Sequence, residues 1–536
     1  MRYQELRQHT EYTLLGAFGR IGDVVERAQQ LGYPSVCLMD KGTIRGAYHL
    51  QEDCANMPEL KPIEQRRAIK EAERRLNVRK VRKLCLRAMD NEGLTNIYRL
   101  TSESWDAGFY WVPRIDIELL KEHSAGISVS MGGLDGVVTE DLLNGNVAGA
   151  LDTLDALLDS FEGRIWFEIQ PHGSNHVRLN KSIVKVAKAT GVPLIATNDV
   201  HYILDEDVRT HTIILCMKDK KTLKDPDHPI SPEGYHMRTG EEMFAAFQDN
   251  HPTLDPSLVR QAILDTVEVA ERHKAAMVID RFACLVPDIE RKHEDDDVEL
   301  EDLCLDGWGW RDIDQRADKH GIQRIYYLKR LRRELAAIKA QKFPRYFLIV
   351  RDVINWSRSQ GIPVGPGRGS AAGSLVCYLL GITAIDPMEH RLMFERFISP
   401  SRIDMPDIDM DFADHRREEV IRYLHDKYGH DKVSMIATVG RLKGKSALKD
   451  VSRVLGIDFN EVNDITGSIV ERSSGDERAS QTVADSFKEF KVCQDFDAKS
   501  PAVLPLVVRL EGHAKQLGVH AAGVITCPIP LSQVVP

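Results

Sequence analysis

Gly365-Pro-Gly-Arg-Gly-Ser-Ala-Ala-Gly-Ser374 and Asp407-Ile-Asp-Met-Asp411 are the two stretches that carry the strongest signal in this chain. A loop so rich in glycine and alanine has few bulky side chains, so its backbone N–H groups can approach a triphosphate. If residues 407–411 form a strand, the three acids share one face while Ile408 and Met410 enter a core on the other. Together the two stretches predict a nucleotide and metal site.

The acidic cluster alone is ambiguous, because an acidic surface strand is the commoner explanation of three alternating aspartates. The neighbouring glycine-rich loop reverses that preference. Mg²⁺ prefers oxygen ligands and usually completes its shell with substrate phosphates, so the pair of features indicates two-metal phosphoryl or nucleotidyl transfer. The loop is not a P-loop, since no Lys-Ser/Thr pair follows a Gly-x-x-x-x-Gly frame, and its serines do not sit in a Gly-x-Ser-x-Gly elbow.

Longer motifs extend this signal in both directions. Four segments resemble, in order, the palm of the C-family of bacterial replicative DNA polymerases, the DNA polymerase III alpha family: residues 343–348, 361–374, 394–397 and 405–412. The similarity continues through residues 416–420, 445–455 and 518–524, and more weakly back to Glu5. The chain is identified as a member of this family along nearly its whole length.

The resemblance implies roles for individual residues. Asp407 and Asp409 match the catalytic aspartates that bind two Mg²⁺, whereas Asp411 matches a supporting acid. The residues that match contacts to the nucleotide phosphates are Gly367, Arg368, Gly369, Ser370 and Arg396.

A basic helix face is expected farther along the chain. Lys445, Lys449 and Arg453 recur at spacings of four, which suits contact with a DNA or triphosphate backbone. A solvated helix face explains the same spacing equally well.

The composition and net charge of the chain limit where it could contact DNA. The chain has 536 residues, 43% of them hydrophobic, which predicts three or four domains with buried cores. Its net charge of −10 argues against a uniformly basic nucleic-acid binder, so a grip on DNA would need local basic surfaces. Residues 329–333 are one candidate and residues 66–83 another; either could be a solvated helix face, and for the second that interpretation is preferred.

The nine cysteines contain no Cys-x-x-Cys pair, which disfavours both a zinc ribbon and a disulfide framework. No apolar run is long enough to span a membrane, and the first residues lack the apolar core of a signal peptide. We therefore expect a soluble, cytoplasmic protein with no membrane partner.

The order of elements predicts an α/β and α+β multidomain protein. Apolar strands at residues 35–39, 165–169 and 193–197 alternate with amphipathic helices, which suits a barrel. The acidic run 294–302 is too charged to join a core and is the expected domain junction. The resemblance divides the chain into a degenerate PHP domain with a (β/α)7 barrel (1–284), the first part of a nucleotidyltransferase-like palm (285–438), a mainly helical thumb (439–514) and the start of the second part of the palm (515–536).

PHP (polymerase and histidinol phosphatase) domains bind a metal cluster in some members. The residues that match its ligand positions or their motifs are His9, Asp40, Glu168, His172, Asp199 and His201. Other positions depart from the pattern, since histidines are replaced by Arg7, Lys41 and Lys83, a cysteine by Gly133 and a glutamate by Arg67.

These departures predict a PHP domain without metal. Cations at Arg7, Lys41 and Lys83 would neutralise the surviving acids through salt bridges, so metal binding becomes poor in ligands and electrostatically unfavourable. His172 and His201 are then best explained as hydrogen-bonded core histidines. The domain is expected to support the polymerase structurally and to dock a separate proofreading exonuclease, as the resemblance implies.

In the family, a third catalytic aspartate of the palm lies beyond residue 536. So do the fingers, a tandem helix-hairpin-helix domain, the clamp-binding segment and an oligonucleotide-binding fold. We therefore expect either a fragment or one half of a split polymerase, of phage or intein type, which meets the sliding clamp only through its missing C-terminal part.

Three functions stay open at this point. The leading one is DNA synthesis on primer–template DNA, in which the primer 3′-hydroxyl attacks a dNTP and pyrophosphate leaves, with a C-terminal polymerase half supplying the third aspartate. The isolated chain is then expected to be inactive. The alternatives are a catalytically silent scaffold or assembly module and a PHP-type metal-dependent phosphoesterase.

Overall fold

The computed structural model describes residues 1–40, 61–71, 81–109, 113–173, 175–273, 286–398, 406–470 and 482–535. The chain forms two compact units. The first unit comprises Met1–Val278, Ala437–Val519 and Ser532–Pro536, and the second comprises Ile279–Ile436 and His520–Leu531.

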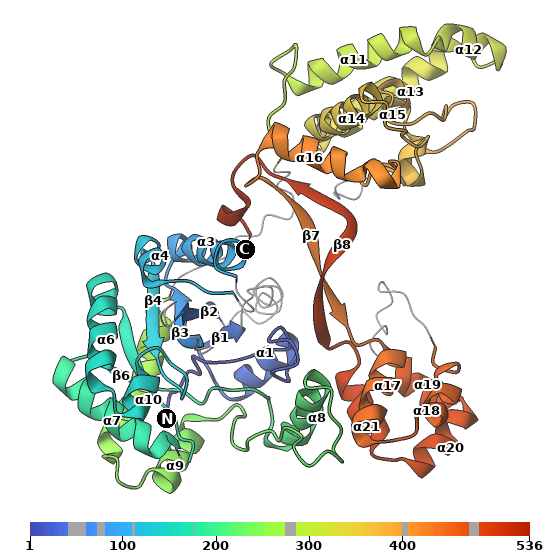
Figure 1. Ribbon diagram of the computed structural model, residues 1–536. Helices are drawn as coiled ribbons and strands as arrows, with labels where there is room; N and C mark the ends of the chain where they lie inside the picture. The colour runs from blue at the N-terminus through green and yellow to red at the C-terminus, as the bar shows by residue number, and fades with distance from the viewer. Residues whose placement is uncertain are drawn as a thin grey trace. The chain divides into compact units, whose positions relative to one another are not determined.

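A six-stranded mixed sheet is the centre of the first unit (Figure 1). Its order is β1 (Ser35–Asp40), β2 (Lys61–Glu71), β3 (Val81–Ala88), β4 (Ile127–Met131), β5 (Ile165–Ile169) and β6 (Leu194–Ala196). β1 and β2 are parallel, as are β4, β5 and β6, whereas β3 runs antiparallel to both its neighbours. Gln8 makes parallel bridges to Leu38 and Val200, so the N-terminal segment lies between β1 and the residues that follow β6.

Helices surround this sheet: α1 (Ile21–Gln30), α3 (Asn91–Asp106), α4 (Ile117–Glu122), α5 (Thr139–Asn144), α6 (Val147–Phe161), α7 (Asn175–Thr190), α8 (Val208–Lys218), α9 (Gly240–Asn250) and α10 (Pro256–Arg272). Several begin at a side-chain cap, as at Asp90, Asp116 and Thr239. Every residue of β1, β4 and β5 is buried, as expected of strands covered on both faces. The strands expected at residues 35–39, 165–169 and 193–197 are β1, β5 and β6, although β6 is a residue shorter at each end.

A helical segment completes the first unit. It contains α17 (Gly444–Leu455), α18 (Phe459–Thr466), α19 (Thr482–Glu489), α20 (Lys491–Lys499) and α21 (Val503–Leu510). Its buried residues Leu448 and Val451 belong to one apolar cluster with Phe18, Ile213 and Met217. The helices therefore pack against α8 and the N-terminal loop of the sheet domain. Flanking them in sequence, β7 (Val433–Arg441) and β8 (Ala514–Thr526) form a two-stranded sheet.

The second unit is mainly helical. It contains α11 (Asp296–Trp310), α12 (Ile313–Lys319), α13 (Arg324–Ala340), α14 (Pro344–Ser359), α15 (Leu375–Leu379) and α16 (Arg417–Tyr428), with 3₁₀ turns at Gly369–Gly373, Phe394–Arg396 and Asp414–Arg416. Its core joins Leu300, Tyr327, Phe347 and Leu379.

The acidic run 294–302, expected to be a domain junction too charged to join a core, is instead the start of a helix that enters the core. Asp295 caps α11, and the run forms the first turns of that helix. Glu299 is buried and accepts the backbone N–H groups of Lys292 (3.0 Å) and His293 (2.9 Å), while Leu300 enters the core. Acids are favourable here because the N-terminus of a helix carries partial positive charge.

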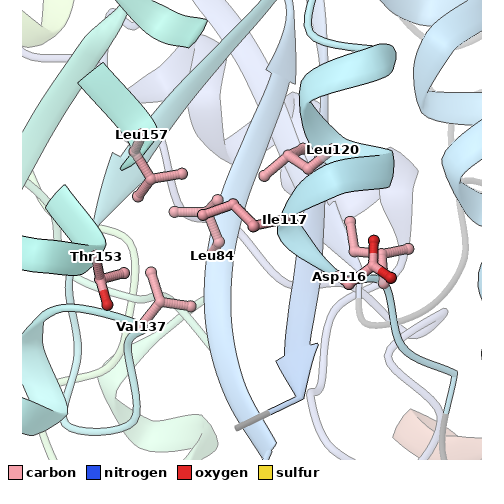
Figure 2. A pocket seen from close by; sticks show the side chains of 8 residues that line it. Leu84, Asp116, Ile117, Leu120, Val137, Thr153 and Leu157 are labelled. Atoms are coloured by element: carbon pink, nitrogen blue, oxygen red, sulfur yellow. The ribbon is translucent and has the colours of Figure 1, made fainter. Parts of the chain in front are cut away.

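The seven cysteines in the described ranges are all buried. None of the helices in the same ranges is both long and apolar enough to cross a membrane. A small apolar cavity of about 10 Å³ lies beside β3 and α4, lined by Leu84, Ile117, Leu120 and Leu157 among others (Figure 2). It has room for roughly one water molecule, so it offers no ligand site.

Candidate functional site

The glycine-rich loop and the acidic segment lie side by side in the second unit. Val364 and Phe412 form an antiparallel bridge, and the Gly365 N–H donates to the Asp411 carbonyl at 2.9 Å. The Ala413 N–H donates to the Pro363 carbonyl at 3.3 Å. These backbone contacts bring residues 367–370 next to residues 407–411.

Two glycines give the loop its course. Gly367 and Gly369 have φ angles of +91° and +67°, which favour residues without a Cβ. A Cβ on Gly367 would stand 2.7 Å from the Thr383 side chain, and one on Gly369 would stand 3.5 Å from Asp409 Oδ2. The loop backbone therefore runs directly against the acids.

The predicted carboxylate strand is not a strand in this structure. Residues 406–411 have no regular secondary structure, and Phe412 makes only the single bridge to Val364. The predicted alternation of side chains is nevertheless present. Ile408 is buried and Met410 packs against the core, while Asp407 and Asp411 are exposed and Asp409 is partly exposed. The buried apolar residues, rather than a hydrogen-bonded ladder, set which way the acids face.

Arg368 contacts two of the three acids. Its Nη2 lies 3.1 Å from Asp409 Oδ1, and its Nε lies 3.2 Å from Asp411 Oδ1. The other expected phosphate-contact residues are nearby in the chain: Ser370 is half-buried in the 3₁₀ turn Gly369–Gly373, and Arg396 is exposed at the end of Phe394–Arg396. The glycine-rich loop therefore contributes Arg368 as a counterion of Asp409 and Asp411.

A buried glutamate binds the backbone and side chain of the residues at the end of the glycine-rich loop. Glu334 of α13 is fully buried and accepts the N–H groups of Leu375 and Val376, both at 3.0 Å, and the Ser374 hydroxyl at 2.9 Å. Burial raises the pKa of Glu334. Arg330 Nε donates to Glu334 Oε1 at 2.5 Å. Sequence reasoning missed Glu334, although its i,i+4 spacing from Arg330 is a signal that could have found it.

This arrangement corrects one expectation about residues 329–333. Arg330 also donates to the carbonyls of Gly373 (2.6 Å) and Leu392 (3.1 Å), so it is a structural residue and not a free DNA contact. Arg333 is exposed and pairs with Glu395 at 3.0 Å. The stretch 66–83 lies largely outside the described side chains.

Tyr346, within the motif 343–348, positions the acidic segment. Its hydroxyl accepts the Ile408 N–H at 3.3 Å. The bond fixes the backbone between Asp407 and Asp409, so this motif contributes to the acid geometry without carrying a charge.

The acid pair suits a divalent cation. Asp407 and Asp409 offer oxygen ligands at the protein surface, which is the donor type that Mg²⁺ prefers. The Arg368 guanidinium already stands where the acids attract positive charge. The residues present therefore fit a metal site.

The basic residues of α17 lie in the first unit. Lys449 Nζ donates to Asn463 Oδ1 at 3.2 Å, and Arg453 donates to the Lys221 carbonyl at 3.3 Å. Lys445 is half-buried near the start of the helix. Two of the three side chains thus hold neighbouring segments, and their role in binding DNA stays a prediction.

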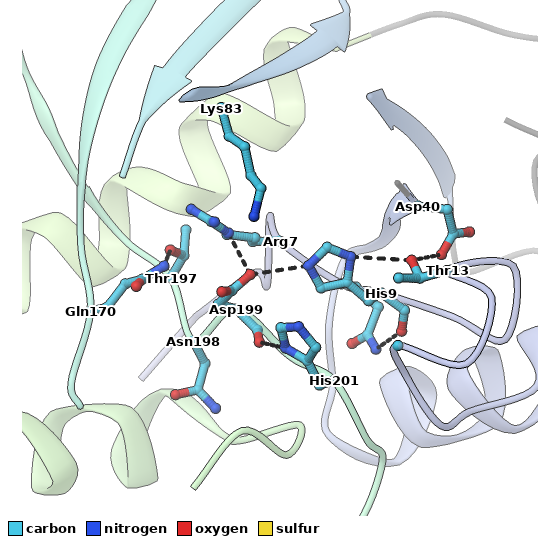
Figure 3. A network of polar contacts seen from close by, with 12 residues as sticks. Arg7, His9, Thr13, Asp40, Lys83, Gln170, Thr197, Asn198, Asp199 and His201 are labelled. Carbon is cyan, nitrogen blue, oxygen red and sulfur yellow. Dashed lines mark hydrogen bonds and ion pairs between the residues drawn. The ribbon is translucent and has the colours of Figure 1, made fainter. Parts of the chain in front are cut away.

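A second group of polar residues lies in the first unit, where the N-terminal segment meets β5 and the residues that follow β6 (Figure 3). Arg7, fully buried, donates through Nε to Asp199 Oδ1 at 2.5 Å and through Nη1 to Glu168 Oε2 at 2.8 Å. Arg87 adds a contact to Glu168 Oε1 at 3.2 Å. A Cβ on Gly133 would stand 3.0 Å from Arg7 Nη2, so Arg7 occupies the space beside the position where the family has a cysteine.

These cations set the charge state of Glu168. Burial alone would raise its pKa, but the Arg7 and Arg87 guanidinium groups outweigh burial and lower the pKa to about 2. Glu168 therefore stays ionised inside the protein.

His9, Asp199 and His201 are brought together by this fold. One ligand atom from each lies within 4.8 Å of the others, a spacing that could hold a metal ion. His9 Nε2 lies 3.1 Å from Asp199 Oδ1, the same oxygen that Arg7 contacts. His201 Nδ1 lies 2.6 Å from the Asp199 carbonyl. Any metal here would compete with Arg7 for Asp199.

The remaining expected ligands have other partners. Asp40 accepts from Thr10 N (2.7 Å), Thr10 Oγ1 (2.6 Å) and Thr13 Oγ1 (2.8 Å), and burial raises its pKa to about 6. His172 Nε2 lies 2.9 Å from the Asn198 carbonyl, and burial together with His176 lowers the pKa of His172 to about 3.

Of the replaced positions, Lys83 pairs with Asp135. Lys41 and the side chain of Arg67 lie outside the described residues.

Comparison with known families defines the class of protein. Residues 5–172 match the PHP domain, and residues 300–536 match the bacterial DNA polymerase III alpha NTPase domain. A PHP domain followed by this polymerase domain is the arrangement that the sequence motifs predicted.

The particular relatives are DNA polymerase III alpha subunits. The subunit of Thermus aquaticus is 33% identical over 100% of this chain and 48% of its own length, and that of Aquifex aeolicus (strain VF5) is 32% identical with the same coverage. The chain is homologous to the N-terminal part of DNA polymerase III subunit alpha. It spans about half the length of the curated relatives it matches. A candidate metal-dependent phosphoesterase of Bifidobacterium adolescentis aligns over 46% of this chain and 96% of its own at 13% identity, with a TM-score of 0.27, too low to bear on the fold.

Proposed function

We propose that this chain provides the nucleotide-binding loop and two metal-binding acids of a DNA-directed DNA polymerase. The observation that carries the proposal is the placement of Gly367–Ser370 directly against Asp409, two residues from Asp407. The homology to DNA polymerase III alpha agrees with it.

The residues divide the work of nucleotidyl transfer. Asp407 and Asp409 would hold two Mg²⁺ ions, which activate the primer 3′-hydroxyl and neutralise charge on the phosphates when bound. The backbone N–H groups of Gly369 and Ser370 donate to phosphate oxygens, because the glycines leave the backbone open. Arg396 adds positive charge. The primer 3′-hydroxyl gives up its proton to solvent, and its oxygen bonds to the α-phosphorus of the dNTP as the bond to the β-phosphate oxygen breaks and pyrophosphate leaves.

The rest of the chain supports this reaction. We assign residues 1–284 to a PHP-type (β/α)7 barrel, 285–438 and 515–536 to parts of the palm, and 439–514 to the thumb. Lys445, Lys449 and Arg453 would contact the backbone of primer–template DNA, with Lys449 and Arg453 leaving their present partners to do so. We place the protein in the cytoplasm.

Because the relatives are about twice as long, synthesis would also need the part of the palm that carries the third aspartate. The test is primer extension with the chain alone and with a polypeptide that matches the remaining half of the relatives. We expect extension only in the mixture, and its loss with Asp407→Asn. Asp318→Asn, an exposed acid on α12, is the matched control and should leave extension unchanged.

Other outcomes would change the assignment. Extension by the chain alone would refute the need for a second polypeptide. A folded mixture that binds primer–template DNA but never extends it would favour the silent scaffold.

For the barrel we infer a structural role without metal. The ion pairs of Arg7 with Glu168 and Asp199 support it, because they use acids that a metal would need. The same domain would dock a proofreading exonuclease. The grouping of His9, Asp199 and His201 favours one second candidate, a metal-dependent phosphoesterase. Phosphodiesterase activity that survives Asp407→Asn and is lost with Asp199→Asn would establish that second function.

A further inference from the structure

Arg368 occupies the acid cluster of the polymerase site. Its two contacts use different nitrogens, Nη2 to Asp409 and Nε to Asp411, at 3.1 and 3.2 Å. One guanidinium therefore neutralises an acid expected to bind metal and its exposed neighbour at the same time. Asp407 makes no ion pair among the described residues, so the third carboxylate of the cluster stays open to solvent.

The residues on either side of Arg368 have no side chains that could confine it. Gly367 and Gly369, both at positive φ, flank it on either side, while Arg368 itself is extended at φ −142° and ψ 178°. Its side chain is 59% exposed. Because most of the side chain is exposed to solvent, its departure from the acids would break no core packing.

The charges near the loop make two alternative partners available to Arg368. Without ligands, Asp407, Asp409 and Asp411 are the negative groups beside it. With a triphosphate on the backbone of Gly369 and Ser370, new negative oxygens would lie one or two residues away along the same loop. Arginine is suited to both, since its planar fork binds carboxylates and phosphates in the same manner.

We propose that Arg368 is an exchangeable counterion of the polymerase site. Before ligands bind it neutralises Asp409 and Asp411; once metal and nucleotide are present it leaves Asp409 and pairs with a phosphate oxygen. This inference rests on the proposed function. It means that metal alone binds weakly, because it competes with Arg368, and that metal and nucleotide strengthen each other's binding.

If Arg368 exchanges partners, one substitution should raise the affinity for metal and lower the affinity for nucleotide. Arg368→Ala removes the competitor of the metal and also a contact to the phosphate. Mn²⁺ binding to the full chain, measured by electron paramagnetic resonance without nucleotide, should tighten about three- to tenfold, the range expected for two exposed ion pairs. Binding of dATP in the presence of saturating Mn²⁺ should weaken about tenfold. Arg368→Lys should fall between the alanine variant and the wild type on both measurements.

Two control variants distinguish a failure of the counterion exchange from a failure of the proposed polymerase function. Arg324→Ala removes an exposed arginine of the same unit, paired with Asp314 at 3.1 Å, and should change neither affinity. Asp409→Asn should abolish Mn²⁺ binding, so that the signal of free Mn²⁺ is no longer reduced by the protein. If the Asp409→Asn variant binds Mn²⁺ as tightly as the wild type does, the proposed metal site itself is wrong.

If Asp409→Asn does abolish binding but Arg368→Ala leaves the Mn²⁺ affinity unchanged, only the counterion exchange is refuted. Weakening of both affinities by Arg368→Ala, with an unchanged circular dichroism spectrum, would show that Arg368 supports the site instead of competing for it.

Discussion

The carboxylate of Glu11 lies 3.1 Å from the guanidinium of Arg441 and also accepts the backbone N–H of Ala514 at 3.0 Å. Arg441 is the last residue of β7, and Ala514 is the first of β8. One buried acid in the N-terminal loop therefore holds both strands where the helical segment 442–513 leaves and rejoins them. Phe18, from the same loop, stacks on His513 with ring centroids 5.9 Å apart.

Glu11→Ala should loosen this junction. The substitution removes the acceptor of a buried N–H and one partner of an ion pair, which costs about 1–3 kcal/mol. Amide hydrogen exchange at the start of β8 and in α21 should become faster by at least tenfold. Glu26→Ala, on the exposed face of α1, is the matched control and should leave these amides unchanged. If these amides exchange at the same rate in Glu11→Ala and in the wild type, the apolar cluster alone holds the segment 442–513 in place.

Glu168 should make the first unit sensitive to acid. Its pKa of about 2 in the folded protein is below the ordinary value of 4.5, so its stabilising contribution is complete above pH 4.5 and is lost as the pH falls toward 2. The loss is on the order of 3 kcal/mol. Glu168→Gln should lower the thermal midpoint at pH 7, because Arg7 and Arg87 stay buried without it, and should flatten the pH dependence below 4.5.

Glu118→Gln, an exposed acid of α4, controls for the loss of a carboxylate. A steep dependence on pH below 4.5 that persists in Glu168→Gln would assign the acid sensitivity to other groups.

Arg7→His should make the group of polar residues in the first unit a better metal site. The substitution removes the cation that contacts Glu168 and Asp199, and it adds an imidazole near His9. Zn²⁺ affinity, measured by calorimetry, should rise about tenfold or more over the wild type. Arg178→His adds a histidine on the exposed face of α7 and should not raise it. Stoichiometric Zn, Mn or Fe in the purified wild-type chain would contradict the metal-free barrel.

Glu334→Ala should destabilise the second unit by about 3–5 kcal/mol. It leaves the N–H groups of Leu375 and Val376 without their acceptor and Arg330 without its counter-charge. Thermal unfolding of the second unit measures the loss. Glu395→Ala breaks the exposed pair with Arg333 and should cost less than about 1 kcal/mol. Similar losses in the two variants would show that the loop does not depend on its buried support.

Local pattern was enough to predict which side chains of the acidic segment face solvent at the proposed polymerase site. Spacing in sequence predicted that Ile408 would be buried while Asp407 faces solvent, because alternation depends only on the nearest residues. It could not predict that residues 406–411 lack a strand, since a ladder requires a partner that only the fold supplies. The course of the loop against Asp409 depends in the same way on the distant bridge from Val364 to Phe412.

Charged residues were the hardest to place from the sequence. Arg330 and its exposed neighbour Arg333 look alike in a basic run, yet one is held by Glu334 and two carbonyls while the other faces solvent. Glu299 lies in an acidic run but is buried, because the backbone N–H groups of Lys292 and His293 meet it there. The burial of a charge depends on donors and acceptors brought by other elements, which no local pattern records.

The apolar cluster shared by α8 and α17 has a consequence for synthesis on the ribosome. Met217 and Leu442, both in that cluster, are separated by roughly 220 residues, which take about 10–45 s to translate. During that interval the nascent chain presents Phe18, Ile213 and Met217 without the helices that will cover them. Most of the second unit is contiguous in sequence and is translated within the same interval. The order of translation therefore lets the inserted unit fold before the one into which it is inserted, and it leaves the apolar surface of α8 open to aggregation in newly made chains.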